Sequence, residues 1–194
     1  MAKERWGGGA LLAPLPPAMV SCGSMEKPNI ITVAWCGILA THPPVTYISV
    51  RPSRHSYGLI KESGEFVINL TTEELVKSCD LCGIYTGKKV DKFKKCGLTP
   101  EASEKVSCPS IGESPLSIEC KVREIVPLGS HDMFIADIVS IGVDESLIDE
   151  NGKLRLDKAK LAAFAHGEYF ALGKKLGYFG YSAKKKKKKP VNKK

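Results

Sequence analysis

Two long segments in the second half of the chain alternate apolar and polar side chains, and a short connection separates them. They are residues 117–127 (SIECKVREIVP) and residues 133–143 (MFIADIVSIGV). Alternation of this kind is typical of strands with one buried face, and two such runs joined by a short loop predict a long antiparallel pair. The loop holds Gly129 and His131, so we expect His131 at the surface or at the mouth of a pocket.

Shorter segments extend this pattern through the rest of the chain. We expect further strands at residues 18–24, 30–40, 46–51 and 65–71. Pro52 should end the third of these, because proline has no N–H to donate to a neighbouring strand. We expect helices at residues 53–63 and 71–85, and either a short helix or an irregular segment at residues 158–164. Short strands with few helices predict a mainly β fold, a closed antiparallel barrel with helices packed outside.

The chain has the size of one domain. Its 194 residues, 43% of them hydrophobic, are enough to bury a substantial core. No apolar run is long enough to cross a bilayer. Near the N-terminus Pro14, Pro16 and Pro17 interrupt a short apolar run, so a signal peptide is not predicted and a cytoplasmic location is the simpler expectation.

The net charge of +8 resides in the C-terminal tail. Eight lysines and no acid lie between Lys184 and Lys194, and without them the remaining 21 Lys and Arg equal the 21 Asp and Glu. A neutral body gives no support for binding nucleic acid, and a run of like charges predicts a disordered tail. We therefore expect an extension at residues 1–14, one domain at residues 15–182 and a Lys-rich tail at residues 183–194.

The chain has seven cysteines, an odd number that argues against a full set of disulfides. Cys79 and Cys82 have the spacing of a zinc or redox pair, and Cys96 and Cys108 are the candidates to complete a tetrahedral set. The second pair lacks the usual close spacing, and a helix over residues 71–85 would place the first pair on one face. Free buried thiols in a reducing compartment are the expected state, and no metal site is predicted.

A cluster of cations and hydroxyl groups follows the third expected strand. Ser53 is at the expected N-cap of the next helix, where free amides and the positive dipole end favour a phosphate. Arg51 and Arg54 add charged donors, and His55 and Ser56 lie in the first turn. These residues predict a site for a phosphorylated cofactor, and the alternative is an ordinary solvated loop.

Five segments occur in an order that is informative together. They are residues 29–35 (NIITVAW), 49–56 (SVRPSRHS), 66–70 (FVINL), 86–93 (TGKKVDKF) and 129–134 (GSHDMF). Together they resemble the FMN-binding split-barrel family, specifically its flavin reductase-like or flavoredoxin branch. The resemblance covers most of residues 15–182 and implies an antiparallel Greek-key split β-barrel.

The resemblance also implies a cofactor, FMN, and the residues that hold it. In the family, the strand matching residues 29–35 lies along the isoalloxazine edge, and the segment matching residues 49–56 holds the ribityl phosphate. Backbone amides from Thr32 to Cys36 would then donate to the ring, beside which Cys36 lies. No catalytic side chain is implied. The implied binding residues are Thr32, Val33, Ala34, Trp35, Cys36, Ser49, Arg51, Ser53, Arg54, His55, Ser56, Thr86, Gly87, Lys88 and His131.

Three classes of function follow from these expectations. The first is a flavin reductase that takes electrons from NADH or NADPH and passes them to free flavin, ferric iron or a partner protein. The second is a flavoredoxin-type electron carrier without its own nicotinamide site. Because the chain has no GxGxxG fingerprint, any nicotinamide would stack directly on the flavin. The third is a cysteine-based, metal-binding structural protein, which predicts a colourless preparation.

The C-terminal segment at residues 167–181 is rich in glycine and aromatic residues. It resembles the family's C-terminal segment, which packs near the flavin or across a dimer contact, and the alternative is an arm docked on the barrel. Tyr169 and Tyr178 are the candidates within it. The resemblance, together with the frequency of two-fold pairing, predicts a homodimer.

Overall fold

The computed structural model describes residues 1–183, and the predicted lysine run from Lys184 onward lies outside the described residues. The centre of the fold is a seven-stranded sheet in the order β2-β1-β5-β8-β9-β4-β3, in which every pair of neighbours is antiparallel. Its strands are β1 (Ala18–Gly23), β2 (Pro28–Val33), β3 (Cys36–Thr41), β4 (Pro44–Val50), β5 (Glu65–Leu70), β8 (Leu116–Pro127) and β9 (Asp132–Val143).

The long antiparallel pair predicted from alternation is confirmed as β8 and β9. Their register runs from Leu116 opposite Val143 to Pro127 opposite Asp132, with irregularities in two places. Such bulges bend a strand and increase its twist. The pair therefore curls, and it carries β5 on one side and β4 on the other.

The prediction of one strand over residues 30–40 is wrong. The chain bends at Ala34 and Trp35, which divide the segment into β2 and β3. These two strands are the opposite ends of the sheet, although they are consecutive in the chain. The carbonyl of Trp35 accepts a hydrogen bond from the Ser49 amide of β4 at 2.8 Å. The curled sheet thus brings its two ends together at this bend and leaves a split between β2 and β4.

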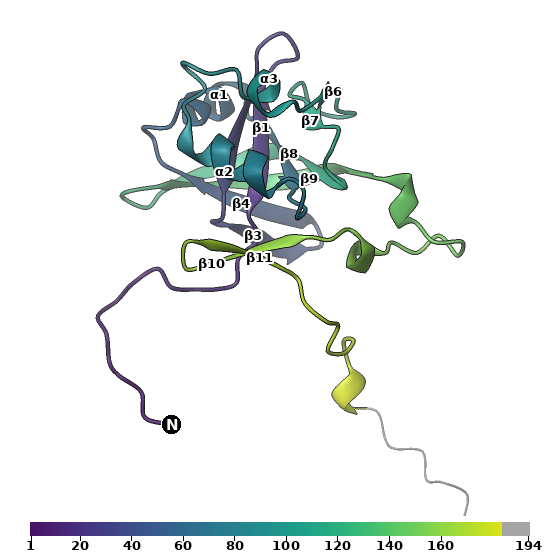
Figure 1. Cartoon of the computed structure of the whole chain (residues 1–194). Helices are drawn as coiled ribbons and strands as arrows, with labels where there is room; N and C mark the ends of the chain where they lie inside the picture. Colours follow the sequence, from purple (N-terminus) through teal and green to yellow (C-terminus); the bar gives the residue numbers. More distant parts are fainter. Residues whose placement is uncertain (184–194) are drawn as a thin grey trace, which may run out of the picture.

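Three helices lie together around β1 and β2 (Figure 1). They are α1 (His55–Ser63), α2 (Val76–Ile84) and α3 (Lys92–Cys96). The expected helix over residues 71–85 starts late, because residues 72–75 form a turn in which the Leu75 amide bonds the Thr72 hydroxyl at 3.3 Å. Helix α3 was not expected. It begins at the N-cap Asp91, whose carboxylate accepts from the Lys94 amide at 3.0 Å.

Apolar side chains fill two main clusters. The larger one lies inside the curled sheet and under α1, with Phe66, Phe134 and Ile60 fully buried. The second lies between β1, β2 and the helices α2 and α3, and it contains Met19 and Phe93. The helices therefore cover the side of the sheet next to the split.

The remaining elements lie at the periphery of the sheet. They are the short pair β6 (Pro100–Glu101) and β7 (Ser110–Ile111), the hairpin β10 (Ala162–Ala165) and β11 (Glu168–Ala171), and 3-10 helices at Glu145–Leu147, Leu156–Lys158 and Tyr181–Ala183. Residues 158–164 thus combine the end of a 3-10 helix with the start of β10. Before β1 and after β11 the chain forms two arms that leave the same end of the molecule (Figure 1). Within residues 1–183, no helix is long and apolar enough to cross a membrane.

Candidate functional site

Two adjoining cavities lie where the split meets the helices. The first, called here the split cavity, has a volume of about 350 Å³. The second, the cationic cavity, has a volume of about 200 Å³. Ile31, Arg51 and Arg54 line both. Their combined size falls within the range of roughly 300–1,000 Å³ that is typical of cofactor sites.

The split cavity lies between the end of β2 and the end of β4. Its walls are formed by Ile31, Thr32, Val33, Ala34, Trp35, Ser49, Val50, Arg51, Arg54 and His131. Trp35, 46% exposed, stacks on His131 with ring centroids 6.2 Å apart and planes inclined by 13°. The cavity therefore combines backbone from two strand ends with two flat side chains, a suitable environment for a planar ring.

Burial lowers the pKa of His131, and the positive charges of Arg51 and Arg54 lower it further. These effects favour the neutral imidazole over the imidazolium. One ring nitrogen of a neutral imidazole donates and the other accepts, and Nδ1 lies 3.0 Å from the Ser130 hydroxyl. His131 can thus hydrogen-bond a ligand without adding a charge.

The cationic cavity begins at the N-terminus of α1. The prediction of Ser53 as the N-cap is wrong, because Arg54 holds that position with an extended backbone (φ −76°, ψ 140°). No side chain caps the helix. The expectation that free amides and the positive end of the helix dipole face an anion here thus applies to a helix start that has no side-chain cap.

Lys92 also lines this cavity. Its side chain is 3% exposed, and Nζ donates to the carbonyl of Ile30 at 2.6 Å and to that of Cys82 at 2.7 Å. Burial lowers the pKa of Lys92, and the charge of Arg54 lowers it too, whereas neighbouring cysteines raise it. An ammonium has three donors, so one remains beyond the two carbonyls. A buried cation of this kind is stabilised by an anionic ligand.

The far wall of the cationic cavity is tightly packed. A Cβ added to Gly87 would overlap the Asn29 side chain and lie 2.9 Å from Cδ2 of His55. Asn29 is itself held in place, because it donates to the Ser56 hydroxyl at 2.7 Å. Beyond this wall a separate groove shares only His55 and Gly87 with the cationic cavity. Glycine is therefore required for the close approach of the loop to α1.

Of the predicted binding residues, thirteen line the two cavities, and Cys36 and Lys88 do not. Cys36 packs in the larger core cluster, where burial raises the pKa of its thiol to about 12. Lys88 lines the groove beyond Gly87. Six further lining residues were not among the predicted binding residues: Ile31, Val50, Cys82, Gly83, Tyr85 and Lys92. Ile31, Val50 and Lys92 stood inside quoted segments, and Cys82 had been considered only as a metal or redox residue. The burial of Lys92 depends on packing that the sequence does not display.

The cysteines do not form the suggested tetrahedral set. Sγ of Cys82 lies 3.9 Å from Sγ of Cys96, whereas Cys108 packs in another cluster with Val67 and Val106. All seven are free thiols, and no group of three or more metal-ligating side chains occurs within residues 1–183.

Comparison with known proteins identifies the family. The model of the family described as "Flavin reductase like domain" matches residues 12–173. The chain belongs to this family. Among solved structures it is similar to the flavoredoxin of Desulfovibrio vulgaris (Miyazaki F), with 34% identity and a TM-score of 0.87 over 94% of this chain and 100% of that chain. The expected antiparallel split barrel is thereby confirmed.

Two curated relatives extend the comparison. An uncharacterized protein of Archaeoglobus fulgidus is 37% identical over 130 residues, which are 67% of this chain and 73% of the relative. The "FMN reductase (NADH) RutF" of Pseudomonas syringae pv. syringae (strain B728a) is 24% identical over 119 residues, 61% of this chain and 64% of the relative. The flavin reductase-like family contains both kinds of protein that the sequence suggested, reductases and flavoredoxins.

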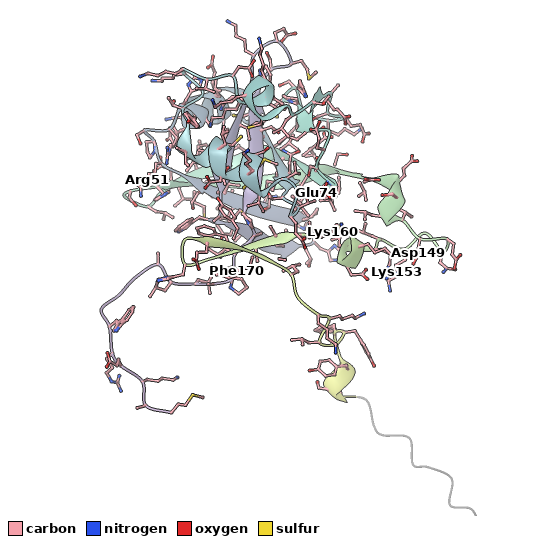
Figure 2. The ribbon with its side chains drawn as sticks, in the orientation of Figure 1. Arg51, Glu74, Asp149, Lys153, Lys160 and Phe170 are labelled. Carbon is pink, nitrogen blue, oxygen red and sulfur yellow. The ribbon has the colours of Figure 1, made fainter. Side chains whose placement is uncertain are left out.

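The family points to a flavin, and the cavities fit one. A flavin has a flat ring system and at least one phosphate at the other end. Flat side chains and strand ends surround the split cavity, while Arg51, Arg54 and Lys92 surround the cationic cavity. Among residues 1–183, no carboxylate lines either cavity. The acidic residue Asp149, by contrast, lies on the opposite side of the molecule from Arg51 (Figure 2).

Proposed function

We propose that this protein binds FMN across the two cavities and transfers electrons or hydride from a reduced donor to an acceptor. The ring would occupy the split cavity, and the phosphate would occupy the cationic cavity. The proposal rests mainly on the charge of the cationic cavity. The Lys92 ammonium, the Arg51 and Arg54 guanidinium groups and the uncapped N-terminus of α1 surround it, and among residues 1–183 no carboxylate lines it. The adjoining split cavity has flat side chains in its walls.

The packed wall at Gly87 supports FMN in preference to FAD. The cationic cavity ends where the loop meets Asn29 and His55, so it has room for a terminal phosphate. FAD would have to carry its second phosphate and adenosine past this wall. We therefore expect FMN to bind more tightly than FAD, and parallel titrations of the protein with the two flavins test this expectation.

The hydride and electron chemistry belongs to the flavin, and the protein supplies binding, orientation and electrostatics. Arg51 and Lys92 neutralise the phosphate, and the strand ends of β2 and β4 hold the ring plane. His131 remains neutral and offers one hydrogen bond, while Trp35 covers the ring opening. No side chain of the site is required as a proton donor, so we assign no catalytic residue.

Reductase activity is the leading role, and a carrier role is the second candidate. The carrier role rests on the 34% identity with a flavoredoxin over almost the whole chain. The deciding experiment is the visible spectrum of the purified protein with FMN, recorded under anaerobic conditions before and after NADH or NADPH. Bleaching by a nicotinamide supports the reductase. Bleaching only by a chemical reductant supports the carrier, and failure to bind FMN at all rejects both.

We also propose a cytoplasmic homodimer in which the arms take part. Leu11, Leu12, Leu172 and Leu176 of the arms are exposed, and so is Ile38 on the end strand β3. A partner chain that covered these exposed apolar side chains would remove them from water. Sedimentation of the FMN-bound protein as a single chain would reject the dimer.

A further inference from the structure

We propose that Cys82 and Cys96 form a reversible disulfide that closes the loop of the cationic cavity. The proposal rests on the proposed flavin function for its source of oxidant and for its effect on binding, whereas added peroxide tests the bond itself. Sγ of Cys82 and Sγ of Cys96 are in contact at 3.9 Å, the atoms belong to different helices, and a bond requires an approach of about 2 Å.

The two cysteines lie on either side of the segment that forms one wall of the cavity. This segment, residues 83–95, contains Thr86 and Gly87 and also the buried Lys92. Cys82 lines the cavity itself, and its carbonyl accepts the hydrogen bond from Lys92. A covalent link between α2 and α3 would therefore fix both ends of the loop around Thr86 and Gly87.

The two thiols differ in access, which sets the order of the reaction. Cys82 is fully buried, and burial raises the pKa of its thiol, as does the neighbouring Cys96. Cys96 is partly exposed and is the thiol that a soluble oxidant reaches first. Cys79, which forms the Cys-x-x-Cys spacing with Cys82, is also fully buried. The thiol in contact with Cys96, however, is that of Cys82.

The oxidant is hydrogen peroxide, which dioxygen produces when it reoxidises a reduced flavin, so the proposed function generates it. The Cys96 sulfur attacks one peroxide oxygen, the O–O bond breaks, and a sulfenic acid and one water form. The Cys82 sulfur then attacks the Cys96 sulfur, and the hydroxyl leaves with the thiol proton as a second water. Two thiols lose two electrons and two protons, and one peroxide is reduced to two waters.

The test uses the full chain, first reduced with dithiothreitol and then treated with stoichiometric hydrogen peroxide. Digestion with trypsin and an endoprotease that cleaves before Asp separates the candidates. Residues 80–88 then contain only Cys82, residues 96–105 contain only Cys96, and residues 78–79 contain Cys79. We expect one linked pair, 80–88 with 96–105, two hydrogens lighter than the sum of the peptides. A link to Cys79, or conversion of Cys96 to sulfinic acid alone, overturns the proposal.

Variants provide the matched controls. Cys96→Ser should abolish the link, whereas Cys79→Ser should retain it, and Cys96→Ala guards against an effect of the serine hydroxyl. Oxidation of the unsubstituted chain should raise the melting temperature by about 5 °C, and this rise should disappear in Cys96→Ser. Persistence of the rise in Cys96→Ser contradicts the assignment.

FMN fluorescence titration separates this inference from the proposed function. With its loop fixed, the oxidised protein should bind FMN roughly 3- to 10-fold more tightly than the reduced protein. Equal affinities would reject the effect on the cavity. Absence of FMN binding in both forms would reject the proposed function, while a Cys82–Cys96 link in the same sample would still stand.

Discussion

The split cavity and the cationic cavity adjoin, but they are built in different ways. The split cavity is made largely of strand ends, with Trp35 and His131 as its two ring-bearing side chains. The cationic cavity is made of charged and hydroxyl side chains around one helix N-terminus, and a buried ammonium faces it. If FMN binds as proposed, the cationic cavity would supply most of the affinity, and the split cavity would orient the reactive ring.

The largest effect on binding is expected from Arg51→Ala, because Arg51 lines both cavities. Loss of a charged hydrogen bond should weaken FMN binding by about 1.5–3 kcal/mol, measured by fluorescence titration. Arg123→Ala is the matched control, since Arg123 forms an exposed ion pair with Asp137 on β9. Unchanged flavin retention in Arg51→Ala would reject Arg51 as a ligand.

Gly87→Ala tests the wall of the cationic cavity. The new Cβ would displace the Asn29 side chain, which is bonded to Ser56, so both the free energy of unfolding and FMN affinity should fall by about 1–3 kcal/mol. Gly58→Ala in α1 is the control, because a Cβ there meets nothing within 4 Å. It should leave binding unchanged and stabilise the helix by roughly 0.5–1 kcal/mol. Equal behaviour of the two variants in denaturant unfolding would contradict the tight wall.

Trp35→Leu probes the split cavity and should have a smaller effect on affinity. Loss of one aromatic contact is expected to cost about 0.5–1.5 kcal/mol of FMN binding, while the visible bands of the flavin should shift because the ring loses its flat neighbour. Trp6→Leu is the control, an exposed tryptophan on the N-terminal arm that lines neither cavity. A loss of affinity as large as that of Arg51→Ala would remove the distinction between the cavities.

The smallest effect concerns the titration of His131. Its pKa is lowered by burial and by Arg51 and Arg54, so Arg51→Ala should move the pKa of His131 upward. Because the pKa of His131 is lower in the folded state, the unfolded state binds a proton at this imidazole more readily. His131 should therefore reduce the free energy of unfolding as the pH falls below about 6.5, the ordinary histidine pKa, and should not change it at higher pH. Imidazole NMR signals across a pH series measure the pKa, with His131→Gln assigning the signal. A downward shift would contradict the electrostatic link between the cavities.

Local patterns in the sequence were sufficient for much of this arrangement. Alternation located β8 and β9, and the cluster around Arg51 and Arg54 located the cationic cavity, because both signals reside in neighbouring residues. The bend at Ala34 and Trp35 was missed, because neither residue is a glycine or a proline, the local signals of a break, and the apolar run continues through both. The burial of Lys92 and the contact of Cys82 with Cys96 depend on how α2 and α3 dock, which no local pattern expresses.

The bend between β2 and β3 has a consequence for how the chain folds. Since the two ends of the sheet are consecutive in sequence, only Ala34 and Trp35 have to be fixed to join them. The entropy lost on closing a loop increases with its length, so this closure costs little compared with joining ends that are distant in the chain. We therefore expect the contact between Trp35 and β4 to form early in folding, with a small loss of entropy. Residues inserted between Val33 and Cys36 should lower the free energy of unfolding more than insertions of equal length in the arms.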